Sequence, residues 1–294
     1  MSARRGIHDS SRAAAPAQPA SWVDVTRQLI VIVAVVFALI AGIVGTGATG
    51  GKPINEAFSG ALDSDGSFVA PARQAFGIWS VIYAGLLAYA IWQALPGQRA
   101  SVRQRSVGWW IALTAALNGV WVLTVQLGSL TQTVVVIVVL LAALCVAFWR
   151  VVAGAGPGQE GAARSGSGWL DSLLIDGVTG LHLGWVFVAT VANFAGWITF
   201  IAANTWPRDP AVWGVVTVSL VGVVAVALAY FTRGRIAPSL AIAWGLGWIA
   251  VARAFGEPFQ LSTAIAASIV AVIVLLVPLG LKAWRLYGAE SPAA

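Results

Sequence analysis

The segment Phe76-Gly77-Ile78-Trp79-Ser80-Val81-Ile82-Tyr83 carries the clearest chemical signal in the sequence. Phe76, Trp79 and Tyr83 stand at positions i, i+3 and i+7, so a helix would present the three rings on one face. Aromatic faces stack on flat apolar molecules, and indole and phenol groups add a hydrogen-bonding tip. The pattern favours a binding surface for a flat hydrophobic ligand. The alternative is a packed core, which accommodates the same rings.

Two later segments place amide and aromatic side chains at helical spacing. Asn118 and Trp121 are three residues apart, and Trp185, Ala189 and Asn193 follow one another at intervals of four. A buried asparagine in hydrocarbon needs a hydrogen-bond partner, so it faces another helix or a ligand. These residues predict either the wall of a cavity or a close helix–helix seam, in which one such hydrogen bond contributes about 1 kcal/mol.

His182 begins the stripe that leads to Trp185, and Asp171 and Asp176 precede it. A histidine in a membrane helix is a candidate axial ligand for haem iron or a member of a proton relay. The alternative that we favour is a histidine at the membrane interface, with acids that stabilise the start of a helix through its dipole.

The elements that position these residues are membrane helices. The chain has 294 residues, of which 59% are hydrophobic and 10% charged, against about 25% charged in an ordinary soluble domain. A spanning helix needs about 20 mainly apolar residues. Eight segments meet this requirement, and we expect an all-α integral membrane protein with spans near 28–45, 76–95, 107–127, 131–152, 178–201, 211–231, 236–253 and 263–283.

The distribution of basic residues predicts the orientation. With the N-terminus in the cytoplasm, only Lys52, Arg73, Arg208 and Arg253 of the 17 lysines and arginines lie outside. Eight spans return the C-terminus to the cytoplasm as well. We expect a multi-pass protein of the cell membrane, and the basic pI of about 10.2 reflects topology rather than nucleic-acid binding.

Four regions follow from this division of the chain. Residues 1–27 are expected to form a disordered cytoplasmic tail, 28–201 a first bundle of five helices, 202–284 three further helices and 285–294 a second tail. Residues 46–75 form a loop between the first two spans, long enough to fold over the bundle as a lid.

Three motifs resemble a known family. The motifs are Phe76-x-x-Trp79-x-x-x-Tyr83 after a proline, Leu117-Asn118-x-x-Trp121, and the segment from Gly184 to Asn193. In this order, over residues 28–201, they resemble the tryptophan-rich sensory proteins, the family of TspO and the mitochondrial translocator (peripheral benzodiazepine receptor) proteins.

The resemblance implies a five-helix bundle that binds tetrapyrroles such as protoporphyrin IX. The implied pocket lies between spans two, three and five, and its residues are Trp79, Tyr83, Asn118, Trp121, Trp185, Ala189 and Asn193. The implied role is that of a membrane receptor, sensor or transport accessory, with porphyrin or haem as ligand and a homodimer as a possible assembly. An enzyme is not expected, although some relatives have been proposed to degrade porphyrin.

The chain departs from the family pattern in three places. The aromatic pair that often approaches the ligand from the first loop in the family has no clear counterpart in residues 46–70. His182-Leu183-Gly184 stands where the family usually has Pro-Tyr before the tryptophan of the fifth span, and three helices follow the five. Two alternatives therefore remain open. One is a secondary transporter of a small hydrophobic solute that uses all eight helices, and the other is a membrane scaffold without a ligand.

Overall fold

The computed structural model describes residues 19–154, 168–202 and 210–288. Within these ranges all regular secondary structure is helical, and the predicted tail segments 1–18 and 289–294 lie outside them. The helices are α1 (Trp22–Gly45), α2 (Ile78–Gln93), α3 (Val102–Leu127), α4 (Leu130–Ala153), α5 (Gly168–Asp171), α6 (Val178–Ile201), α7 (Pro210–Phe231), α8 (Ile236–Phe255) and α9 (Leu261–Gly288). Two 3₁₀ helices, Ile54–Gly60 and Arg73–Gly77, lie between α1 and α2, and a π-helical turn, Ser172–Gly177, joins α5 to α6.

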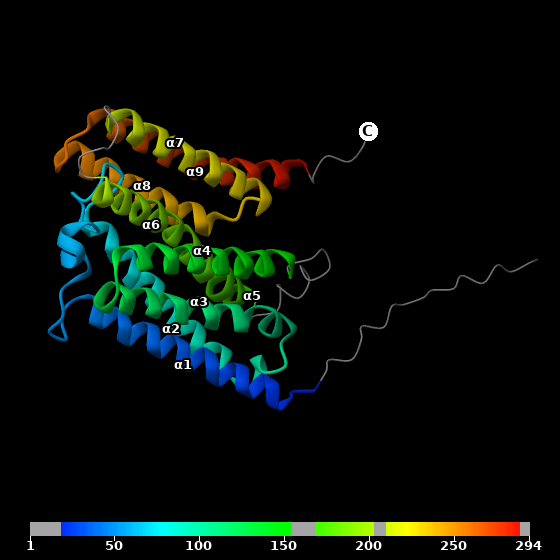
Figure 1. Ribbon diagram of the computed structural model, residues 1–294. Helices are drawn as coiled ribbons and strands as arrows, with labels where there is room; N and C mark the ends of the chain where they lie inside the picture. Colours follow the sequence, from blue (N-terminus) through cyan, green and yellow to red (C-terminus); the bar gives the residue numbers. More distant parts are fainter. Residues whose placement is uncertain (1–18, 155–167, 203–209, 289–294) are drawn as a thin grey trace, which may run out of the picture.

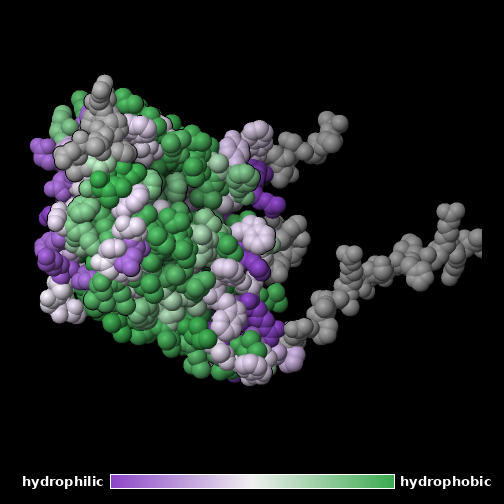
Figure 2. Space-filling view, in the orientation of Figure 1, coloured by the Kyte–Doolittle hydropathy of each residue, from purple (hydrophilic) through white to green (hydrophobic). Residues whose placement is uncertain are grey.

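Eight of these helical segments are long and apolar enough to cross a membrane, as predicted. Figure 2 shows a broad hydrophobic band over the helices, with hydrophilic residues gathered at the two ends of the bundle. The protein is therefore a multi-pass membrane protein. An even number of spans also explains why the beginning of α1 and the end of α9 lie at the same end of the bundle (Figure 1).

The helices form a layered stack rather than two separate bundles (Figure 1). Helix α1 packs on α3, α3 on α4, α4 on α6, and α6 on α8, while α7 and α9 complete the far side. One hydrophobic core lies among α1, α2, α3, α4 and α6, and a second joins α6 to α7, α8 and α9. Of the three C-terminal spans, α8 is the inner one, since it packs against both α6 and α9.

The structure corrects two boundaries predicted from the sequence. Residues 22–27, assigned to a disordered tail, form the first turns of α1, where Asp24 and Arg27 are buried. At the other end, α9 extends through Gly288, into the predicted second tail. Charged residues lower the mean hydropathy at a helix end, so a hydropathy profile places the end too early or too late. At the start of α1, Asp24 and Arg27 form ion pairs and hydrogen bonds with other residues.

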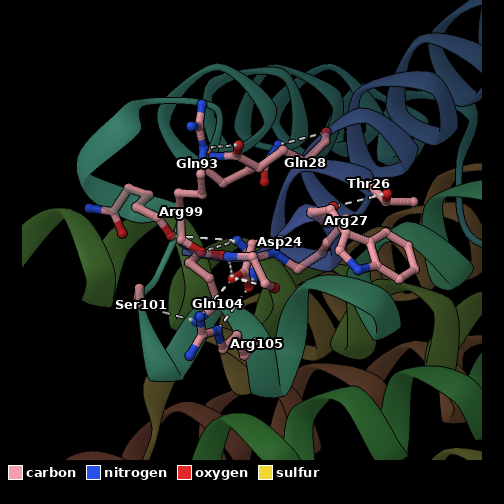
Figure 3. A network of polar contacts seen from close by, with 12 residues as sticks. Asp24, Thr26, Arg27, Gln28, Gln93, Arg99, Ser101, Gln104 and Arg105 are labelled. Atoms are coloured by element: carbon pink, nitrogen blue, oxygen red, sulfur yellow. Dashed lines mark hydrogen bonds and ion pairs between the residues drawn. The ribbon is translucent and has the colours of Figure 1, made fainter. Parts of the chain in front are cut away.

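These contacts form the polar network of Figure 3, at the end of the bundle where α1 begins. Asp24 accepts hydrogen bonds from Arg27 Nη1 at 3.0 Å and Arg105 Nε at 2.8 Å. Arg27 also donates to the Arg99 carbonyl oxygen at 3.0 Å, and Gln28 donates to the Gln93 carbonyl oxygen at 2.6 Å. Because polar groups in an apolar environment must be paired, the network sets the register of α1 against α2 and α3.

Candidate ligand site

A folded loop closes the end of the bundle opposite to the polar network of Figure 3. This cap, residues 46–72, includes the 3₁₀ helix Ile54–Gly60, which packs on α3 (Figure 1). The Ala61 carbonyl oxygen lies so close to α6 that a Cβ on Gly196 would be 2.3 Å from it. Gly196 lies three residues after Asn193 in α6, and the absence of a side chain there admits the cap.

Helix α8 anchors the cap from the side of the three C-terminal spans. The Arg253 guanidinium is fully buried, and it donates to the carbonyl oxygens of Ser67 (3.1 Å) and Ser64 in the cap. It also donates to the Glu257 carbonyl oxygen in the turn before α9, at 3.0 Å. In addition, the Ala72 backbone N–H donates to the Trp248 carbonyl oxygen at 3.1 Å. The C-terminal helices therefore hold the cap in place.

An ion pair within the loop region fixes the end of the cap next to α2. Asp63 accepts hydrogen bonds from Arg73 Nε at 2.8 Å and from Arg73 Nη2. The Asp63 side chain is buried while that of Arg73 is largely exposed. The hydrogen bonds from Arg73 lower the pKa of the Asp63 carboxyl, because they stabilise its charged form more than burial destabilises it. The pair therefore stays ionised at neutral pH.

Beneath the cap, aromatic rings from α2 and α6 form one cluster. Trp79 stacks on Tyr83 with ring centroids 5.3 Å apart, and its ring meets those of Trp185 (6.2 Å) and His182 (5.9 Å) edge-on. Phe76 meets Trp185 edge-on at 5.8 Å. These are favourable geometries for aromatic pairs. The structure thus brings together the rings that helical spacing had selected.

Two cavities border this cluster, where the sequence predicted a single pocket between spans two, three and five. The larger has a volume of about 610 Å³, and Trp79, Tyr83 and Trp121 line it. The smaller has a volume of about 40 Å³ and is lined by Trp121, Trp185, Ala189 and Asn193. Trp121 stands in the wall that the two cavities share, together with Phe76 and Ile54.

The larger cavity lies between α1, α2, α3 and the cap, so the predicted placement is corrected. Between α2 and α6 the rings of Trp79 and Trp185 meet edge-on, and the smaller cavity lies between the cap, α3 and α6. Sequence analysis missed the contribution of α1, whose lining residues, such as Leu39 and Ile43, are ordinary apolar residues. The one available signal was Gly42, where a Cβ would be 2.8 Å from the Tyr83 ring.

The remaining predicted residues lie at the edges of the site. Asn118 is fully buried and lines neither cavity, and its Nδ2 lies 3.5 Å from His182 Nε2. Asn193 accepts a hydrogen bond from Thr133 Oγ1 at 3.3 Å, which joins α6 to α4. Ala189 contributes a small side chain to the smaller cavity. Asn118 and Asn193 thus both make the helix–helix contacts that were the alternative reading of a buried asparagine.

Three buried polar atoms of the cluster have no hydrogen-bond partner among the described residues. They are the indole nitrogens of Trp121 and Trp185 and the Oδ1 atom of Asn118. Leaving a buried donor or acceptor unpaired costs about 1–3 kcal/mol. Both tryptophans line the cavities, but their indole nitrogens are covered by protein, so an acceptor would reach them only after the rings rotate.

The helical segment that contains the fifth span begins at Gly168 rather than near 178, so His182 lies about 20 Å from its start. The location of His182 at the membrane interface stays a prediction. The ring is buried against Trp79, and His182 lines neither cavity. Among the described residues no group of three or more His, Cys, Asp or Glu side chains is arranged to hold a metal ion. These contacts do not fit an axial ligand for haem iron.

The two acids that precede His182 form ion pairs with other helices. Asp176 pairs with Arg103 of α3 and, at 2.9 Å, with Arg235 at the start of α8. Asp171 lies 3.6 Å from the Arg103 guanidinium. These residues connect α3, α6 and α8 at the end opposite the cap. They therefore form a junction between helices, and Asp171 also stands in the first turn of α5, at a helix start as predicted.

Comparison with known proteins agrees with the fold and the motifs. No curated protein and no solved structure matches the chain. The family model of the TSPO-like proteins matches residues 29–278. The match includes α7, α8 and most of α9, beyond the residues 28–201 that carry the three motifs. The chain therefore belongs to the family of TSPO-like proteins.

Proposed function

We propose that this protein binds a flat, largely apolar ligand of the porphyrin class beneath the cap, and that it acts as a receptor, sensor or transport accessory rather than as an enzyme. The observation that carries the proposal is the cavity of about 610 Å³ with the Trp79–Tyr83 stack and Trp121 in its wall. Its volume is in the range of small-molecule sites, about 300–1,000 Å³. Its lining is mainly apolar, with Arg73 as its charged residue.

Two features of the cavity suit a porphyrin in particular. The N–H of Trp121 has no partner among the described residues and is covered by protein, and a rotation of the ring towards the cavity would bring it to an acceptor at the ligand edge. Arg73 lines the cavity at its cap end, and its side chain is 65% exposed there. An arginine at the mouth of an apolar cavity favours a ligand that carries carboxylates on an otherwise flat hydrophobic body.

Titration of the purified protein with protoporphyrin IX, followed by tryptophan fluorescence, tests this proposal. We expect saturable quenching in the wild type. Trp121→Phe keeps an aromatic ring but removes the N–H, so the dissociation constant should rise about 2- to 10-fold. Trp79→Ala removes a whole wall of the cavity, and the dissociation constant should rise about 10-fold or more.

The matched control is Trp149→Phe, on an exposed part of α4. This variant should bind as tightly as the wild type. A wild type without saturable quenching, or variants Trp79→Ala and Trp121→Phe that bind unchanged, would disprove the porphyrin site. Uptake of the ligand into liposomes that saturates and depends on an ion gradient would instead favour the eight-helix transporter.

We further propose that the polar end of Figure 3 faces the cytoplasm of a cell membrane. The arginines Arg27, Arg99, Arg105 and Arg235 gather there, and cytoplasmic ends of membrane proteins are enriched in basic residues. A fluorescent protein fused to either terminus should therefore fluoresce in the cytoplasm. A reporter inserted near Gly50 in the cap should be active only on the other side. Activity of the cap reporter in the cytoplasm would show that the orientation is the opposite of the proposed one.

A further inference from the structure

A second large cavity lies away from the candidate porphyrin site, between α6, α7 and the cap. This α6–α7 groove has a volume of about 450 Å³, and none of the residues that line it is charged. Its walls run from Ser67 and Val69 in the cap along α6 and α7, with Val138 of α4 on one side. Helix α7 belongs to the three C-terminal spans, so the groove exists only because the chain continues beyond its first five spans.

The groove opens sideways, within the hydrophobic band of the bundle. Val138, Phe194, Leu220 and Val224 line it, and their exposed fractions are 48%, 47%, 59% and 49%. All four belong to spanning helices, so in the membrane these surfaces face hydrocarbon rather than water. An occupant therefore enters from the bilayer.

The length of the groove matches one leaflet. Its lining on α6 extends from Thr199, near the capped end, to Phe187. Twelve residues of α helix rise about 18 Å. Half of the hydrocarbon core of a bilayer is about 15 Å thick. A single acyl chain that runs from the interface towards the bilayer midplane would fill such a groove.

The capped end of the groove supplies a polar group at the depth of the lipid headgroup region. Ser67 is only 2% exposed, lines the groove, and its Oγ has no hydrogen-bond partner among the described residues. The backbone carbonyl oxygen of Ser67 already accepts a hydrogen bond from Arg253 of α8. The hydroxyl is buried beside the groove, and a rotation of the serine side chain towards the groove would let it donate to an acceptor on an occupant.

We propose that the α6–α7 groove binds one acyl chain of a membrane phospholipid, and that Ser67 donates a hydrogen bond to the ester carbonyl of that chain. The absence of charge in the lining, the lateral opening, the leaflet-length walls and the unpaired hydroxyl at the interface all suit this occupant. The lipid would brace α7 against α6 and contact the cap. This site is separate from the porphyrin site, so either proposal can fail while the other stands.

Photocrosslinking in vesicles tests the lipid site. The protein is reconstituted in phosphatidylcholine that includes a fraction with a photoactivatable group in the acyl chain, and labelled peptides are identified by mass spectrometry. We expect labelling of groove residues on α6 and α7 well above that of the lipid-facing side of α9. Ala195→Phe should fill the groove and reduce its labelling to the level of α9. Ser67→Ala should reduce it about 2- to 10-fold, the effect of one hydrogen bond.

Ala142→Phe is the matched control, because Ala142 is exposed on α4 and does not line the groove. It should leave the labelling of the groove unchanged. Groove labelling equal to that of α9 in the wild type, or unaffected by both Ala195→Phe and Ser67→Ala, would overturn the proposal. Labelling by a photoactivatable free fatty acid but not by the phospholipid would also overturn it, in favour of a small diffusible ligand.

Discussion

Arg253→Met is expected to lower the free energy of unfolding by about 3 kcal/mol, since each hydrogen bond to a charged group contributes about 1.5–3 kcal/mol and water at the cap recovers part of the loss. The guanidinium is 0% exposed and joins Ser64, Ser67 and Glu257 through their carbonyl oxygens. Methionine fills much of the same space but leaves these acceptors unpaired. The melting temperature in a fixed detergent measures the loss.

The loss should be concentrated in the cap. Hydrogen–deuterium exchange of the peptide that contains residues 61–72 should become faster in Arg253→Met, while exchange of α3 and α4 stays slow. Arg285→Met is the control, because Arg285 is exposed and donates to one carbonyl oxygen, that of Arg233. It should change stability by less than about 1 kcal/mol. Unchanged cap exchange in Arg253→Met would show that α8 does not anchor the cap.

Gly184→Ala should destabilise the protein by about 1–3 kcal/mol or more, because it overpacks the seam between α6 and α8. A Cβ at Gly184 would be 2.2 Å from the Pro238 carbonyl oxygen and 3.0 Å from Ala241 Cβ. Both neighbours are short or belong to the backbone, so they cannot rotate away. The two helices would have to separate, which would also displace Trp185, the residue next to the substitution.

Gly247→Ala provides the opposite expectation. Gly247 stands in a Leu-Gly-Trp sequence that matches the one at Gly184, but a Cβ there would meet nothing within 4 Å. Alanine in an open position of a helix stabilises by about 0.5–1 kcal/mol relative to glycine. Melting temperatures of the two variants should therefore shift in opposite directions. Equal shifts of the melting temperature in the two variants would show that the two glycines are packed alike, contrary to the structure.

The comparison of these glycines shows why part of the site could not be predicted. Trp185 and Trp248 occupy the same place in the repeated sequence. Trp185 is buried at the smaller cavity with an unpaired N–H, whereas Trp248 uses its carbonyl oxygen to hold Ala72 at the end of the cap. The segments 183–189 and 246–252 share five of seven residues, yet the elements that surround them differ.

The sequence alone determined that this is a helical membrane protein, how many spans it has and which aromatic residues share a helix face. These properties depend only on residues that are close together in the chain. Apolar length specifies a spanning helix, and a period of 3.6 residues places Trp79 with Tyr83 on one face wherever the helix packs. The burial of His182 and of the Asp24–Arg27 pair was decided by tertiary structure. So were the α1 wall of the larger cavity and the contact from Arg253 to the cap. Each of these features depends on which helices meet. The Asp24–Arg27 pair is local, but its burial and the other contacts require residues that are distant in the chain, and no sequence periodicity encodes them.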